Sequence, residues 1–166
     1  MINNTHMAQY IPPTDFHCVT GTWTSTAGNV AGTISKHKSA NAETATVSIP
    51  IQIPSNSVAL QGAKLVSIEV DYELTGDTAT SVTATLQKVT RGADTAVAVV
   101  TQPAITQDLV AAVGAATLDQ HKLTVTLTTP AWIDNDEYYI LQLAFVAKAA
   151  TVIDLLAAVA NYVFRS

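Results

Sequence analysis

The most regular alternation of apolar and polar positions lies in residues 63–89 and predicts two strands joined by a short turn. On the first strand every second residue is apolar, namely Val66, Ile68, Val70, Tyr72 and Leu74. A period of two indicates an extended strand with one buried face. The turn at residues 75–78 contains glycine and aspartate, and the second strand then places Val82, Ala84 and Leu86 on one side. We interpret this segment as the hairpin around which the rest of the chain is organised.

Shorter strands are predicted on both sides of this hairpin. We expect them in residues 16–26, 44–53, 95–101 and 121–128, with either a short strand or a loop in residues 30–38. Pro50 indicates that its strand lies at a sheet edge or contains an irregularity, because proline cannot donate to a ladder. Residues 105–119 predict a loop with one helical turn that begins at Asp108.

Two C-terminal strands, in residues 138–147 and 152–164, differ from the others because both of their faces are largely apolar. A strand that is apolar on both faces needs cover on both, and a partner subunit is the simplest second cover. On the last strand the even-numbered residues should share one face. We therefore expect an interface that includes Tyr138, Ile140, Leu155, Leu156, Tyr162 and Phe164.

The first fifteen residues predict an extended N-terminal arm that lies outside the sandwich. Pro12 and Pro13 favour an extended, polyproline-like path. We expect this arm to lie along a neighbouring subunit or a capsid protein, with Tyr10, Ile11, Pro12 and Pro13 in the contact. The dipeptide His6-Met7 also fits a cloning junction, which would make residues 1–5 vector-derived.

The predicted fold is an all-β, jelly-roll or Greek-key β-sandwich of about eight strands. A chain of 166 residues fits one domain with a sizeable core, here residues 16–166 after an arm at 1–15. Only 13% of the residues are charged and 48% are hydrophobic, which favours strands over surface helices.

The net charge and the single cysteine limit the kinds of partner and covalent link that we expect. The formal net charge is −5 and basic runs are lacking, so nucleic acid is not expected as a partner. Cys18 is the single cysteine, which excludes an intrachain disulfide. We expect no signal peptide. The apolar stretch at residues 149–164 is too short for a typical membrane span and contains Asp154, so no membrane partner is expected.

Three neighbouring carboxylates are the first candidate for chemistry. Glu69, Asp71 and Glu73 project from one strand face, and paired carboxylates at this spacing suit glycosidase acid–base chemistry. The residues that flank them are serine and threonine rather than the aromatic platforms of a sugar site. We therefore favour a solvated face that discourages edge association.

The remaining candidate sites, for a metal ion or a nucleophile, also have interpretations that involve no chemistry. The acidic turn at residues 134–137 offers oxygen ligands to calcium but lacks the glycine and spacing of an EF-hand loop. His17 and Cys18 are adjacent on a strand and point to opposite faces, so they form neither a chelate nor a dyad. A triad of Cys18, His121 and an aspartate has no local support. We expect no catalytic residue, no metal and no cofactor.

A resemblance rests on the order of several strand patterns. Residues 63–72 (AKLVSIEVDY) are followed by a Thr/Leu strand at 82–86, the segment 123–127 (LTVTL), an acidic turn before a Tyr-Tyr pair, and a closing Ala-Asn-Tyr at 160–162. This order resembles a loosely defined class of small phage virion proteins. The resemblance covers about residues 44–164. It implies a single jelly roll that trimerises and decorates heads or forms short fibres and tail parts, and it assigns no functional residues.

The leading expectation is therefore a structural virion protein of a tailed phage, assembled in the host cytoplasm and not an enzyme. Its partners would be two further copies in a trimer and virion proteins such as the major capsid protein. The alternative is a carbohydrate- or receptor-binding β-sandwich module, for which the exposed aromatics available are Trp23, Trp132 and the tyrosines. A hydrolase that uses Glu69 and Asp71 is the third interpretation.

Overall fold

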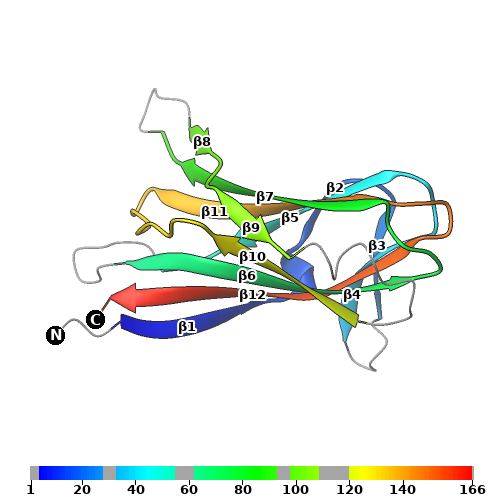
Figure 1. Cartoon of the computed structure of the whole chain (residues 1–166), viewed down its shortest axis with the longest axis horizontal. Helices are drawn as coiled ribbons and strands as arrows, with labels where there is room; N and C mark the ends of the chain where they lie inside the picture. Colours follow the sequence, from blue (N-terminus) through cyan, green and yellow to red (C-terminus); the bar gives the residue numbers. More distant parts are fainter. Residues whose placement is uncertain (1–3, 28–32, 55–61, 93–97, 109–119, 166) are drawn as a thin grey trace.

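Two antiparallel sheets pack face to face in the computed structural model, and their long central strands run along the long axis (Figure 1). The structure describes residues 4–27, 33–54, 62–92, 98–108 and 120–165. The predicted helical turn after Asp108 lies outside these residues.

The larger sheet has seven strands. Its spatial order is β3 (Trp23–Ala27), β4 (Ile34–Lys38), β12 (Val152–Arg165), β6 (Ala63–Thr75), β10 (Gln120–Leu127) and β9 (Ile105–Gln107), with β1 (Asn4–Ile11) also paired to β12. The smaller sheet has five strands in the order β2 (His17–Thr20), β5 (Thr44–Ile51), β11 (Glu137–Val146), β7 (Ser81–Thr90) and β8 (Val99–Thr101). A short 3-10 helix, η1 (Pro13–Asp15), follows β1.

Eight of these strands form a jelly roll. The row β4-β12-β6-β10 faces the row β5-β11-β7-β8. From β4 onward the chain changes sheet between β4 and β5, β5 and β6, β6 and β7, β8 and β9, β10 and β11, and β11 and β12. This connection pattern is that of a double Greek key. The predicted all-β sandwich is therefore confirmed, and β1, β2, β3 and β9 extend it.

The two strands of residues 63–89 form as predicted, but they do not form a hairpin. β6 pairs with β12 and β10 in the larger sheet, whereas β7 pairs with β11 and β8 in the smaller one. The turn between them crosses from one sheet to the other. The alternation was correct because each strand has one buried face, and that pattern carries no information about which strand is the neighbour.

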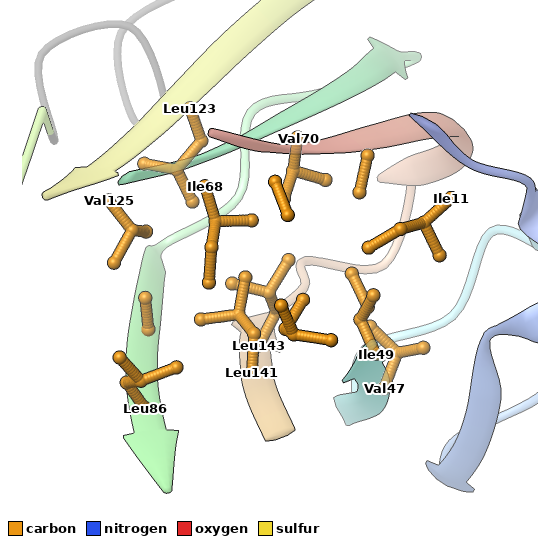
Figure 2. Packing of buried hydrophobic residues seen from close by; sticks show 14 of the residues in the cluster. Ile11, Val47, Ile49, Ile68, Val70, Leu86, Leu123, Val125, Leu141 and Leu143 are labelled. Atoms are coloured by element: carbon orange, nitrogen blue, oxygen red, sulfur yellow. The ribbon is translucent and has the colours of Figure 1, made fainter. Parts of the chain in front are cut away.

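The core lies between the two sheets and is built from the alternate positions of both (Figure 2). In that figure Ile68, Val70, Leu123 and Val125 of the larger sheet point toward Leu86, Leu141, Leu143, Val47 and Ile49 of the smaller sheet. Tyr72 and Trp23 contact Phe145 edge-on, with ring centroids 6.1 and 6.5 Å apart respectively. These ring contacts join the two sheets near the start of β12.

The predicted arm is wrong for residues 4–11. This segment is β1, which pairs antiparallel with β12 of its own chain from Asn4 opposite Arg165 to Ile11 opposite Ala158. Ile11 is buried in the common core, so the segment belongs to the sandwich. The backbone donors of an extended segment need acceptors, and β12 supplies them within the same molecule.

β12 changes register twice, and each change moves side chains to the other face. Leu155 lies opposite Tyr72 and Ala157 opposite Asp71, which leaves Leu156 as the extra residue of a bulge. The second shift leaves Val66 of β6 without a partner on β12. The core therefore contains Ile153 and Leu155 before the first bulge and Ala158, Ala160 and Tyr162 after it.

This geometry corrects two details of the alternation. Val66 is half-buried rather than in the core with the other predicted positions of β6, and Leu156 does not share the inner face with Ala158. Phe164 is half-buried at the margin of the core. A bulge inserts one residue and inverts the inside–outside phase of the residues after it, and no local residue type signals it here.

Pro50 lies where β5 has a partner on one side only. It pairs with Ile140 of β11, while the pairing of β5 with β2 is confined to Thr46, Val47 and Ser48. The prediction of an edge position is confirmed at this residue. The missing amide hydrogen of proline is tolerated because no described strand needs it there.

We expect Phe145→Ala to lower the free energy of unfolding by about 3–5 kcal/mol, because the ring is fully enclosed between the sheets and leaves a cavity. Phe164→Ala should lower it by only about 1–1.5 kcal/mol, because that ring already contacts water. Urea denaturation of both variants tests the ranking, and equal losses would contradict the placement of the core.

Gly76→Ala should destabilise the protein by at least about 2 kcal/mol, from the left-handed backbone and a steric clash together. Gly76 has a φ of +79°, and a Cβ atom there would collide with the carbonyl oxygen of Ala150. Thr80→Ala, an exposed position beside the same turn, is the matched control and should change stability by less than about 0.5 kcal/mol. Equal effects in urea denaturation would contradict the role given to this turn.

Candidate functional site

A hollow of about 640 Å³ lies on the outer face of the seven-stranded sheet. It is lined by residues of β1, η1, β4, β6, β10 and β12, which are Tyr10, Pro12, Pro13, Thr14, Thr33, Ile34, Asp71, Gln120, His121, Lys122 and Leu156. We call this set the junction hollow. Its volume lies within the usual range for small-molecule sites.

The hollow exists because two short strands share one edge of β12. β4 covers that edge from Ile153 to Leu155, and β1 covers it from Ala158 onward. Between the two partners stands the bulge at Leu156. Pro12 and Pro13 end β1 there, since proline cannot continue a ladder, and η1 carries the chain away. The gap between the two partner strands is open to solvent on the outer side.

Opposite charges face each other along one wall of the hollow. The Nζ atom of Lys122 lies 3.1 Å from Oε2 of Glu69, and Nδ2 of Asn161 donates to Oε1 of the same Glu69 at 3.4 Å. Burial raises the pKa of the Asp71 carboxyl above its ordinary value of 3.8, Lys122 opposes this shift, and Glu69 adds to it. Asp71 is thus the carboxylate that lines the hollow, while Glu69 holds Lys122 beside it.

Of the seven tryptophan and tyrosine residues, only Tyr10 and Tyr138 are exposed, with 61% and 42% of their surface accessible. Trp23 packs on Phe145, and its indole donates to the carbonyl oxygen of Thr20 at 2.8 Å. The ring of Trp132 has the ammonium of Lys64 5.2 Å from its centroid. Tyr10 lines the junction hollow, so an exposed aromatic ring and a carboxylate meet at one place on the surface.

The ten predicted interface residues do not form one surface. Tyr10, Pro12, Pro13 and Leu156 line the junction hollow. Ile11, Leu155 and Tyr162 are core residues, and Phe164 packs at the core margin. Tyr138 and Ile140 alternate with the buried residues of β11 and lie on the outer face of the opposite sheet. The two apolar faces of the last strands are thus partly explained by burial inside the sandwich itself.

The structure separates the other predicted candidates. Cys18 is on β2 of the smaller sheet and His121 on β10 of the larger one, and burial raises the pKa of the Cys18 thiol, which opposes a nucleophilic role. In the acidic turn, Glu137 is bound by the Lys88 ammonium at 2.7 Å and by the amide of Asp134 at 2.9 Å. The described residues contain no group of three metal-ligating side chains.

A polar cluster that the sequence reasoning missed lies on the same outer face. The Oγ atom of Ser35 donates to Oδ1 of Asp154 at 2.9 Å, and Nδ1 of His37 lies 3.0 Å from that same oxygen. These are the residue types of a hydrolytic triad, but serine and histidine bind one carboxylate oxygen instead of each other. Since Ser35 is also buried, the cluster joins β4 to β12 rather than presenting a nucleophile.

A second, smaller hollow of about 310 Å³ lies at the other register shift of β12. It is lined by His6, Met7, Ala8, Val66, Asn161 and Tyr162. Both hollows therefore mark places where a bulge interrupts the regular sheet. In the sequence, the lining residues singled out were Tyr10, Pro12, Pro13, Leu156 and Tyr162 as interface residues and Asp71 as one of three carboxylates.

No protein-family model and no curated protein matches this chain. Solved structures that are similar to it include the Clostridium thermocellum endo-1,4-β-D-xylanase 10B CBM22-1–GH10 modules complexed with xylohexaose, at 9% identity and a TM-score of 0.44 over 90% of this chain and 26% of that one. CBM35 from Cellvibrio japonicus is similar at 13% identity and a TM-score of 0.46, over 93% of this chain and 92% of that one. The enzymatically active domain of bacteriophage CBA120 tailspike protein 4 is similar at 12% identity and a TM-score of 0.44, over 88% of this chain and 19% of that one.

At these identities and scores the likeness concerns the general architecture and carries no argument about function. The chain also spans about a quarter of the length of the xylanase structure. In the described part of the chain, no helix has the length and apolar character needed to cross a membrane.

Proposed function

We propose that this chain is a carbohydrate-binding β-sandwich module whose binding site is the junction hollow. The observation that carries the proposal is that the exposed ring of Tyr10 and the Asp71 carboxylate line the same open hollow of about 640 Å³. A sugar ring has an apolar face that stacks on an aromatic ring, and hydroxyl groups that donate to a carboxylate. The two side chains supply both kinds of contact.

The other lining residues suit the same ligand class. Thr14, Gln120 and Lys122 add side-chain donors and acceptors to the lining, and Pro12 and Leu156 add apolar surface. This mixture of an apolar base with a few polar groups is typical of pockets that bind small organic ligands. Because the hollow is set in β strands and a proline-flanked turn, little ordering of the protein opposes binding.

The lining favours binding over hydrolysis. Glycosidases place two carboxyl groups across the scissile bond. Asp71 is the one carboxylate among the described residues that line the hollow, and its neighbour Glu69 is held by Lys122 at 3.1 Å. A site with one carboxylate and one aromatic ring has the groups for recognition but not the pair needed for acid–base chemistry.

Tyr10→Ala should weaken binding of a neutral oligosaccharide by about tenfold, because an aromatic contact contributes about 0.5–1.5 kcal/mol beyond the area that it covers. Tyr10→Phe keeps the ring and should stay within about threefold of the parent protein. Tyr138→Ala removes the other exposed tyrosine, on the opposite sheet, and is the matched control. Isothermal titration against a panel of neutral hexasaccharides measures this. Loss of binding in Tyr138→Ala but not in Tyr10→Ala would refute the site.

Binding should weaken as the pH falls through the raised pKa of Asp71, at a higher pH than that of an ordinary aspartate. Binding weakens at low pH because the ionised carboxylate accepts hydrogen bonds from sugar hydroxyls, whereas the protonated form loses an acceptor. Asp71→Asn should bind more weakly at neutral pH and lose this pH dependence. Affinity measured from pH 7 down to pH 4 checks it, and an unchanged profile in Asp71→Asn would count against a contact at Asp71.

A second candidate function, an assembling structural subunit such as a virion protein, is favoured by the outer face of the smaller sheet. Tyr138, Val89 and Val100 are cross-strand neighbours there, and Val100 is 54% exposed. β1 also favours assembly. Among the described strands it pairs with β12 alone, and residues 5–11 contain no Asp, Glu, Lys or Arg to protect the other edge.

Light scattering at micromolar concentration tests this second candidate. The expected result is a trimer that Val100→Asp weakens, because a buried charge in the contact is unfavourable. A stable monomer for the parent protein would remove this candidate and leave the carbohydrate-binding proposal as it stands.

A further inference from the structure

We infer that the junction hollow selects uncharged glycans and rejects acidic ones such as uronates and sulfated sugars. This inference rests on the proposed function and adds the ligand class. Two observations carry it. Lys122 is the one lysine or arginine among the described residues that line the hollow, and its ammonium is already bound by Glu69 at 3.1 Å.

The second observation is the excess of carboxylates on this face. Glu69 and Asp71 lie on the side of β6 that faces away from the core, and Glu73, two residues further along, is itself buried. Asp154 of β12 is the direct cross-strand neighbour of Glu73, which places a fourth carboxylate on the same surface. His37 lies 3.0 Å from Asp154 and offsets that charge when it is protonated.

An acidic ligand would bind to this arrangement of charges less tightly than an uncharged one. Its carboxylate or sulfate would lie beside Asp71, whose own ionised form is already disfavoured by burial. It would also have to share the Lys122 ammonium with Glu69, whose carboxylate already offsets that charge. Like charges brought together in a binding site suppress the wrong partner, which is how such a surface discriminates. An uncharged glycan needs only hydroxyl contacts and meets no such penalty.

The test compares acidic oligosaccharides with their own carboxyl-reduced forms, so that linkage and length stay matched. The probes are hexamers of galacturonate, of mannuronate and of guluronate, each before and after reduction, together with the panel of neutral hexasaccharides. For every pair that binds, the reduced form should bind at least about tenfold more tightly at low salt. The gap should narrow as the salt concentration rises, because salt screens exposed charges.

Removing one carboxylate near the hollow should weaken the discrimination against acidic ligands. Glu69→Gln removes one negative charge and releases Lys122, so it should bind the acidic hexamers at least about tenfold more tightly than the parent does. Asp134→Asn makes the same change of net charge in the turn before β11, outside the hollow, and should leave the ratio of acidic to reduced binding unchanged.

The outcomes separate the two proposals. If acidic hexamers bind the parent protein as well as or better than their reduced forms, the charge selection is wrong while carbohydrate binding stands. The charge selection is also wrong if Glu69→Gln and Asp134→Asn behave alike. If no oligosaccharide of either kind binds, the proposed function itself fails. Binding of neutral hexasaccharides with no binding of any acidic hexamer supports the inference.

Discussion

Backbone pairing along the two edges of β12 is the constraint on which the rest of the structure depends. One edge pairs with β6 from Val152 to Phe164 and so places the central strands of the larger sheet. The other edge is divided between β4 and β1. The bulge at Leu156 lies where these two partners meet, and it decides which residues of the second half of the strand reach the core. The core, the position of the N-terminal strand and the junction hollow all follow from this one strand.

The two outer faces of the sandwich have different chemistry. Carboxylates gather on the outer face of β6, in the larger sheet, around an open hollow with one exposed tyrosine. On the smaller sheet, Tyr138 of β11 and Val100 of β8 are exposed, with the buried Val89 of β7 between them. Hydrated charge resists burial against another protein, whereas an apolar patch favours it. Ligand binding and assembly would therefore use opposite faces, and one protein could carry out both.

Lys38 of β4 is a buried charged side chain that nearby oxygen atoms stabilise. Lys38 is fully buried, and its ammonium donates to the carbonyl oxygens of Ser39 and Asn41, each at 2.8 Å, with Glu43 at 3.7 Å. A buried ammonium is tolerated only where such acceptors surround it. The position of Lys38 is fixed because Lys38 pairs with Ile153 of β12 and with Trp23 of β3.

Period-two alternation was sufficient to predict the all-β class, the two strands of residues 63–89 and the turn at Gly76. It failed where the answer depended on pairing. The supposed hairpin is split between two sheets, because a strand with one apolar face fits any neighbour that completes its ladder. Residues 1–9 show little apolar pattern and therefore predict an arm, yet β12 offers this segment a free edge.

The candidate site was only partly predictable for the same reason. Tyr10, Pro12, Pro13 and Leu156 were singled out as interface residues, and Asp71 as one of three carboxylates, but nothing linked the two groups. Gln120 and Lys122 of β10 and Thr33, just before β4, are remote in sequence and adjacent only after folding. Leu156 reaches the hollow because a bulge turns it outward, and a bulge has no reliable mark in a single sequence.

Mapping of backbone amide chemical shifts on addition of the tightest-binding neutral hexasaccharide tests the central claim most directly. The account predicts that the perturbed amides cluster at the junction hollow, around Tyr10, Thr14, Ile34, Asp71, Lys122 and Leu156. Perturbations that cluster instead around Tyr138 and Val100 on the opposite sheet would contradict it.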